Sequence, residues 1–581
     1  MIVIKKIYRW LLYALIAILA IFVIAVLAVR FVLFPNINQY KNDLATYASQ
    51  RLGQKITIGD IKTGWDGISP HFSLRNIDLF DAENRSAFHL NNAEANISWL
   101  SIPLLHPHLS NLTVIKPEVT IRREANGEIY AAGINLSGPS KPDFANWLLT
   151  QREISIQNAQ VTWLDDLRQA PLLSLKDLSL KIQNPSWKTI FGRHSFEFSA
   201  LPSAGTQRPI IANGHFIGSD VSKIKEWRGK LFAEVNQADL AVWKPWLDYP
   251  VNILSGTGNS KVWLDFTHAK VEKIKTQSNL SNLSIALENH ASNAQTDILI
   301  ANKFSGVVSW TNLKNVQTIY AQDVKLKTNT GLNITNGNGY YATSTKDGKP
   351  WVKTDFLLDQ LDLATIKQLS SYFKLSPNLT AQLNGFSLVG QLQSVKFGYE
   401  SLAGKALGYK INTAFKGLGL TAYENIPGFS KLTGNIRANE NGGEILLNAQ
   451  NAMLDFKDVL RWPIPADQLN GRINWQTADN ETDVKAKDIF ITSPHITGTV
   501  NASYRIKGND VKNSVLDLTG KFGKGNAKFA PFYYPTILGK PTLQWLDTSV
   551  LAGSAEDVNL VVKGKLGDFP YVNHKNQLDN K

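Results

Sequence analysis

The chain has 581 residues, enough for about three or four ordinary domains, and 43% of them are hydrophobic, which argues against disorder as the dominant state. Lys and Arg number 61 against 48 Asp and Glu, so the formal net charge of +13 is mild for this length. The chain contains no Cys, which excludes disulfides, thiol nucleophiles, Cys-ligated zinc and iron–sulfur clusters.

The N-terminal segment predicts a membrane-spanning helix. Residues 10–29 carry no charge, and at 1.5 Å per residue a helix of that length measures about 30 Å, the thickness of a bilayer's hydrocarbon core. A cleaved signal peptide is the alternative, with Val26-Leu27-Ala28 as a loose cleavage site. The apolar run is longer than the usual core of a signal peptide, and Arg30 precedes further apolar residues, so an uncleaved anchor is favoured.

Basic residues set the expected orientation of this anchor. Lys5, Lys6 and Arg9 precede the apolar run and predict a cytoplasmic tail at residues 1–9, with the remaining chain across the membrane. In a Gram-negative cell that side of the inner membrane is the periplasm.

The residues after the anchor change from helical to strand periodicity. Residues 36–53 are predicted to form a short amphipathic helix that ends at Gly53. From residue 54 to 581 apolar residues recur at every second position, as in Ile154-Ser155-Ile156 and Val161-Thr162-Trp163, which is typical of strands with one apolar and one polar face. No Pro-, Gly- or Ser-rich linker interrupts the pattern. We therefore predict a mainly β chain whose long, curled antiparallel sheet forms an extended apolar groove, with a few short helices.

A weak internal repeat supports this prediction. Its pattern is Asn or Asp, an apolar residue, any residue and a second apolar residue. We interpret the Asn or Asp as a turn residue that opens a strand whose alternate side chains share one face; chance occurrence in a β-rich chain is the alternative. The pattern begins at Asn76, Asn111, Asp177, Asn282, Asp323, Asp488 and Asp557.

Four short helices are predicted between the strands. The segments 239–244 and 362–367 each begin with an Asp that suits the N-cap position, and 143–151 and 542–551 are two further candidates. None is long enough to serve as the repeated crossover of a parallel α/β fold, so an all-β arrangement is favoured over a Rossmann-like one.

An apolar groove left empty would promote aggregation, so the alternation implies an apolar ligand along it. Candidate groove residues are the apolar positions of the alternating segments, for which an ordinary core is the other interpretation. They are Ile154, Ile156, Val161, Trp163, Leu178, Leu180, Leu283, Ile285, Ile489 and Ile491.

Catalytic motifs are weak. The segment 417–419 imitates part of a dinucleotide fingerprint, but it lies in alternating β sequence. His106 and His108 form the only close histidine pair, without a neighbouring third ligand. Asp165 and Asp166 form a carboxylate pair at the end of a predicted strand, where turn residues are expected. We expect no enzyme, no cofactor, no metal and no nucleic-acid partner.

Ordered short motifs resemble AsmA-like proteins and, more narrowly, their YhdP-like branch. The AsmA-like start, residues 34–180, includes Phe34-Pro35-Asn36, Ile56-Thr57-Ile58-Gly59, Trp65-Asp66-Gly67 and Val161-Thr162-Trp163-Leu164-Asp165. The YhdP-like region, residues 181–581, includes Ala238-Asp239-Leu240, Ser255-Gly256-Thr257-Gly258, Pro427-Gly428-Phe429 and Gly567-Asp568-Phe569-Pro570.

This resemblance implies an inner-membrane-anchored periplasmic protein that carries phospholipids along a β-groove toward the outer membrane. The implied partners are phospholipids, the inner membrane and other envelope proteins or outer-membrane components. YhdP-like proteins are longer, so the chain looks like their N-terminal half. A scaffold or assembly factor for outer-membrane proteins, which would use open sheet edges as a template, is the alternative.

Overall fold

The structure is a computed structural model of the whole chain. It describes residues 2–52, 55–80, 86–99, 101, 108–131, 134–135, 143–184, 192–249, 251–268, 270–288, 296–365, 385, 387–423, 426–457, 459–508 and 510–569. His106, Gly53 and the end of the predicted helix 362–367 lie outside these residues.

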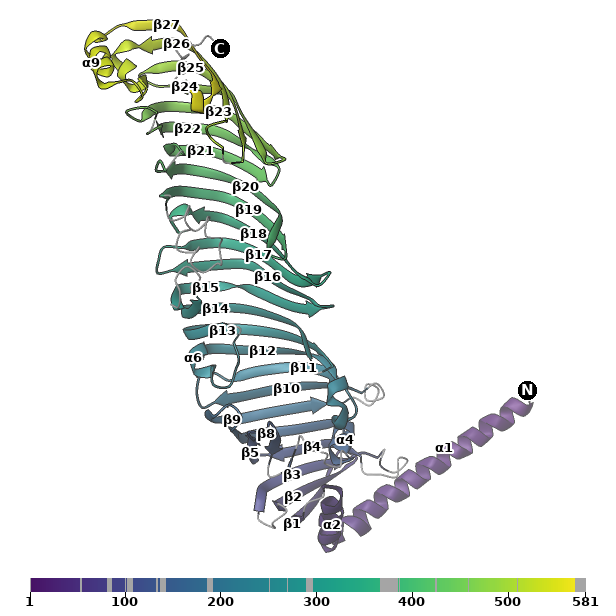
Figure 1. Cartoon of the computed structure of the whole chain (residues 1–581). Coiled ribbons are helices and arrows are strands. Elements are labelled where there is room, and N and C mark those ends of the chain that lie inside the picture. Colours follow the sequence, from purple (N-terminus) through teal and green to yellow (C-terminus); the bar gives the residue numbers. More distant parts are fainter. Residues whose placement is uncertain are drawn as a thin grey trace. The chain divides into compact units, whose positions relative to one another are not determined.

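The chain begins with a continuous helical segment (Figure 1). Helix α1 (Ile2–Ala28) is long and apolar enough to cross a membrane. It continues as a π-helix, η1 (Val29–Leu33), then a 3₁₀-helix, η2 (Phe34–Tyr40), and then α2 (Lys41–Leu52). Helices η2 and α2 are fixed to strand β1 (Ile56–Asp66), because the Ile61 N–H donates to Asn38 Oδ1 at 3.0 Å and Lys41 Nζ donates to the Gly59 carbonyl at 3.1 Å.

The described residues contain 27 strands of one sheet, and the chain divides into two compact units. Unit 1 comprises residues 1–250 and 255–276, and unit 2 comprises 251–254 and 277–581. The remaining strands of unit 1 are β2 (Ser69–Phe80), β3 (Ser86–Ile97), β4 (Leu109–Ile115), β5 (Glu118–Arg123), β6 (Ile129–Ala131), β7 (Ile134–Asn135), β8 (Glu153–Asp165), β9 (Ala170–Gln183), β10 (Arg193–Pro202), β11 (Ile210–Ile217) and β12 (Arg228–Asp239). Strands β13 (Asn252–Thr267) and β14 (Lys270–Glu288) contain the boundary.

The strand pairs given for unit 1 are antiparallel, except for two pairs that involve β8. Strand β8 pairs in parallel with both β4 and β5, end to end along its length. Helix α4 (Asp143–Thr150) precedes β8 and provides the return that a parallel pair requires. The side chain of Gln151, which is fully buried, accepts the N–H of Leu109 at 2.6 Å and so joins the start of β8 to the start of β4.

Unit 2 is an antiparallel meander in which each strand from β15 to β26 pairs with the next. Its strands are β15 (Thr296–Leu313), β16 (Val316–Thr328), β17 (Asn333–Lys346), β18 (Lys349–Asp362), β19 (Leu388–Leu402), β20 (Lys405–Leu420), β21 (Gly428–Asn439), β22 (Gly442–Asp455), β23 (Ile464–Ala478), β24 (Glu481–Thr492), β25 (Ile496–Lys507), β26 (Val515–Asn526) and β27 (Ser554–Lys565).

Short helices lie where the Asp residues predicted them. Asp239 caps α6 (Leu240–Trp243) by accepting the N–H of Ala241 at 3.0 Å, and Asp362 accepts the N–H of Ala364 at 2.9 Å at the start of η4 (Leu363–Thr365). The others are η3 (Val221–Glu226), η5 (Ala527–Tyr533), α9 (Lys540–Ser549) and η6 (Leu566–Asp568). The predicted fold class, a long curled sheet with an N-terminal apolar helix and few helices, is confirmed.

Helices η5 and α9 form a cap on unit 2. Arg461 joins them, since its guanidinium donates to both carboxylate oxygens of Asp547 at 2.8 and 2.7 Å and to the Pro531 carbonyl at 3.0 Å. The buried His495 ring stacks on Phe529 at 4.2 Å between centroids. The Arg461 guanidinium and the aromatic cluster around His495 are therefore two of the contacts that hold the cap.

Candidate functional site: an apolar trough

One face of the sheet in unit 1 is apolar, and the register determines which residues lie on it. Ile156 lies opposite Leu180, which lies opposite Phe198 on the next strand, so these three side chains share a face. The intervening residues, such as Gln157 and Lys181, point to the other face. The apolar residues of single strands thus form one continuous apolar surface, because the register places them opposite one another on neighbouring strands.

The predicted residues of unit 1 meet on this face. Ala159, Leu178 and Ala200 are buried together, and Ile156, Val161 and Leu180 pack against them. Ile154 is also buried and lies opposite Ile182, and Trp163 lies opposite Leu173.

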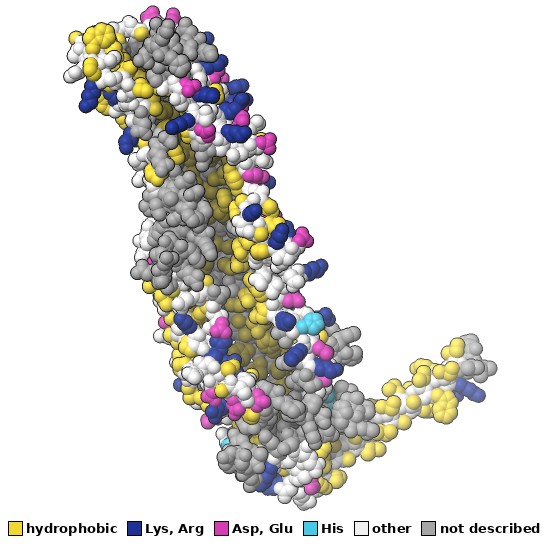
Figure 2. Space-filling model, in the orientation of Figure 1, with side chains coloured by type: hydrophobic (Ala, Val, Ile, Leu, Met, Phe, Trp, Pro, Cys, Tyr) yellow, Lys and Arg dark blue, Asp and Glu magenta, His cyan; other side chains and the backbone are white. Residues whose placement is uncertain are grey.

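The same arrangement is found in unit 2. Ile491 is buried in a cluster with Leu469, Ala452 and Phe522, and Ile489 packs against it. On β14 the predicted Leu283 is buried and Ile285 is half-buried. Within each unit, Figure 2 shows hydrophobic side chains lining the hollowed surface, and Lys, Arg, Asp and Glu side chains along the strand ends.

The strands bend at the bottom of the trough. Six of the seven repeat residues, all except Asn111, have a φ near 50° and lie inside strands. The interpretation that they open strands is therefore wrong. At all six positions the backbone enters the left-handed region, and at Asp177, Asp323 and Asp488 the strand also gains one extra residue, as in a β-bulge.

Each bend changes the spacing of the apolar residues from two to three. In β9 Leu175 and Leu178 face the trough on either side of Asp177, and in β24 Ala486 and Ile489 do so around Asp488. The residue directly after the bend is often among the least exposed of its strand. Examples are Ala159, Leu178, Ala238, Leu283, Val395 and Ala452. In each unit the bends therefore form the floor of the trough, a feature that the two-residue alternation alone did not predict.

At several bends the backbone N–H donates a hydrogen bond to an Asn side chain of the neighbouring strand. The N–H of Asp488 donates to Asn501 Oδ1 at 2.9 Å, and that of Asp323 donates to Asn338 Oδ1 at 3.2 Å. The N–H of Gln237 donates to Asn259 Oδ1 at 2.8 Å. Because a bulge removes the ordinary ladder partner, an Asn side chain replaces it.

The residues considered for chemistry have structural partners. Arg123 donates to Asp165 Oδ1 at 2.9 Å, and Arg122 donates to Asp166 Oδ2 at 2.6 Å. Burial alone would raise the pKa of the Asp165 carboxyl, but hydrogen bonds from Arg123 and the Arg168 N–H, with the Arg123 charge, lower it below its ordinary value. These carboxylates form ion pairs at the rim of the trough.

One further motif has a structural explanation. Gly417, in the fingerprint-like segment, has a φ of 65° and lies at a bulge of β20, so it is another bend. Among the described residues no group of three or more His, Cys, Asp or Glu could hold a metal ion.

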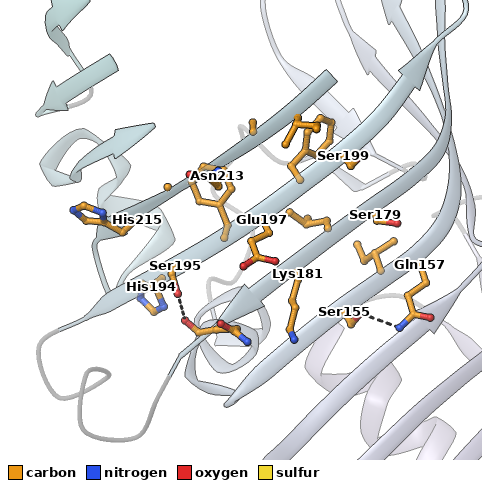
Figure 3. Close-up of a pocket in the computed structure, with 18 of the residues that line it drawn as sticks. Ser155, Gln157, Ser179, Lys181, His194, Ser195, Glu197, Ser199, Asn213 and His215 are labelled. Carbon is orange, nitrogen blue, oxygen red and sulfur yellow. Dashed lines mark hydrogen bonds between the residues drawn. The ribbon is translucent and has the colours of Figure 1, made fainter. Parts of the chain in front are cut away.

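A cavity in unit 1 is lined both by polar residues and by the trough residues Ile156, Leu180 and Phe198. Its volume is about 830 Å³, and it spans β8 to β11. Figure 3 shows its polar side chains, among them Lys181, Ser195 and Glu197, which alternate along the strands with the trough residues. Ser195 Oγ donates to the Gln183 carbonyl at 3.3 Å. The cavity thus mixes polar residues with trough residues at one place in unit 1, whereas the apolar face recurs in both units, so the trough is the better candidate site.

The whole chain, residues 1–581, matches the family model described as YhdP protein. The chain belongs to the YhdP family. Neither the curated proteins nor the solved structures that were compared with it gave a match. Membership of the YhdP family agrees with the resemblance read from the motifs, and it associates the membrane-anchor candidate and the trough with a family of bridge-like lipid transport proteins.

Proposed function

We propose that the protein carries phospholipids along its apolar trough, anchored in the inner membrane by α1 with the sheet in the periplasm. The observation that carries this proposal is the aligned apolar face of each unit, whose rims bear charged side chains. Each CH₂ group transferred from water to an apolar surface gains about 0.8 kcal/mol, so two acyl chains exposed to water cost on the order of 20 kcal/mol. A trough removes most of that cost while the headgroup stays in water.

Transport in this scheme requires no reaction at a catalytic residue. Acyl chains slide over aliphatic and aromatic side chains, which interact through dispersion and without directional bonds. The net direction follows from the supply of lipid at either end or from an external source of energy.

Two adjacent leucines provide the test. Leu447 lies opposite Gly434 and Gly471 on the trough face, whereas Leu446 lies opposite Asn435 and Arg472 on the other face and is 37% exposed. Each is replaced in turn by the photo-crosslinking residue p-benzoylphenylalanine in cells fed with radiolabelled phosphate.

Radiolabelled phospholipid is expected on the variant at 447 and not on the variant at 446. Equal labelling at both positions, or none at 447 in a folded protein, contradicts the proposal. Co-purification of outer-membrane β-barrel proteins without lipid would instead favour the assembly role.

A further inference from the structure

The apolar anchor touches the sheet at one corner of unit 1. The Phe22 ring of α1 meets the Trp99 ring, just after β3, with centroids 4.9 Å apart. Trp99 Nε1 donates to the Ile68 carbonyl at 3.0 Å, in the turn between β1 and β2. We call Ile68 and Trp99 the corner pair. Phe22 of the apolar anchor thus contacts a residue that lies just after a strand of the sheet.

The same corner is connected to the trough face. Phe34, which follows the anchor, packs between Trp65 and Phe72 at 5.3 and 5.4 Å between centroids. Both rings belong to the trough face, because their strands place them in line with Ile61 and Leu74. An apolar surface therefore continues from α1 through these rings to the trough.

The depth of the corner follows from helix geometry. Phe22 lies seven residues before Val29, the last residue of the uncharged run, which corresponds to about 10 Å along a helix. Arg30 lies over the Trp65 ring at 5.7 Å, as expected for a cation and an indole at the boundary between lipid and water. If α1 crosses the membrane, Trp99 reaches the acyl chains of one leaflet.

Ile68, the other residue of the corner pair, is an aliphatic residue that the fold leaves exposed to water. Its side chain is 70% exposed at the end of the β1–β2 turn. The opposite face of this corner is polar: Asn96 Nδ2 donates to Asp66 Oδ2 at 2.8 Å, and Asn96 Oδ1 lies 2.7 Å from His71 Nδ1. The face with Ile68 thus suits acyl chains, and the face with Asn96 suits lipid headgroups and water, as in segments that lie in a membrane interface.

We propose that the corner pair inserts into the leaflet of the membrane that α1 crosses, at the level of the acyl chains, and that lipid passes there from the bilayer to the trough. The second half of this statement rests on the proposed function, whereas the insertion does not. The partner is a lipid surface, chosen because the corner contacts the anchor itself.

The absence of Cys from the sequence allows a direct test by single-cysteine labelling. Ile68→Cys carries an environment-sensitive fluorophore in full-length protein, reconstituted into phosphatidylethanolamine–phosphatidylglycerol vesicles containing lipids with a nitroxide on the acyl chain. Ile24→Cys, in α1 and 65% exposed in the structure, is the positive control.

Leu167→Cys is the matched control. Leu167 is an aliphatic residue at a hairpin turn, 50% exposed, between Asp166 and Arg168, which both form ion pairs. Leu167 follows the end of β8. The start of β8 lies beside the start of β4, where the Arg152 N–H donates to the Leu109 carbonyl, and the start of β4 pairs with the end of β3, next to Trp99. The 13 residues of β8, about 40 Å measured along the strand, separate Leu167 from that end of the sheet.

The nitroxide lipids are expected to quench the label at position 68 as strongly as the label at 24, while aqueous iodide quenches only the label at 167. Quenching of residue 68 by iodide and not by the nitroxide lipids would overturn the proposal. Phospholipid crosslinking at residue 447 is measured separately, so the trough can bind lipid even if the corner does not insert.

The consequence for lipid access is tested with Ile68→Asp and Leu167→Asp. The first substitution is expected to slow loading from vesicles and to leave loading from detergent-dispersed phospholipid unchanged. Equal loading of both variants from vesicles would contradict the role of the corner in access.

Discussion

The row of bends makes a quantitative prediction at Asp488. Its φ is 50° and its side chain is exposed, so a substitution there tests the backbone with little change in packing. The left-handed conformation costs about 1–2 kcal/mol for a residue with a Cβ, is tolerated best by Gly, Asn and Asp, and is worst for β-branched residues. Asp488→Val is therefore expected to destabilise the β24–β25 pairing by about 1–2 kcal/mol, and Asp488→Gly is expected to be neutral or stabilising.

Hydrogen exchange of peptides from β24 and β25 is the appropriate assay, because a long sheet opens locally rather than as one unit. A change of 1–2 kcal/mol corresponds to exchange that is about 5- to 30-fold faster. Lys487→Val is the control, since Lys487 is also exposed but is not among the residues with positive φ. Identical exchange in the two valine variants would refute the assignment of Asp488 as a conformational bend.

Three further predictions concern ion pairs and one buried ring. Asp165→Asn leaves the Arg123 guanidinium, 23% exposed in the native pair, without its counter-ion, and should destabilise unit 1 by about 2 kcal/mol, measured by exchange in β5 and β8; unchanged exchange would contradict a stabilising pair. Arg461→Leu should release α9 and speed its proteolysis, with Lys540→Leu, a substitution of an exposed Lys in the same helix, as the control. Burial lowers the pKa of His495 below its ordinary 6.5, so the unfolded chain binds the proton more readily and the cap should lose stability as pH falls below 6.5. His495→Phe keeps the stacking and should abolish this pH dependence of exchange in η5.

Much of the trough could be predicted from local patterns. The two-residue alternation around Ile154 and Ile489 identified strands with one apolar face, because side chains on a strand alternate without reference to any other part of the chain. The Asp N-caps at 239 and 362 were also predictable, since a cap needs only a side-chain oxygen and the next few N–H groups.

The bends, the parallel pairing of β8 and the ion pairs of Asp165 and Asp166 were not predictable in this way. Each depends on a partner distant in the sequence: Asn501 for Asp488, β4 and β5 for β8, and Arg123 for Asp165. An Asn or Asp before an apolar residue fits a turn and a bulge equally well until a neighbouring strand removes one hydrogen-bond partner.

The sequence by itself determined that the chain starts with an apolar helix of spanning length and continues as strands with one apolar face, because hydrophobic length and period are local properties. Only the tertiary structure decided where each strand bends, which apolar residues meet on the trough floor and which corner of the sheet contacts the anchor. Those features arise from register and cross-strand hydrogen bonds, and residues far apart in the chain define them together.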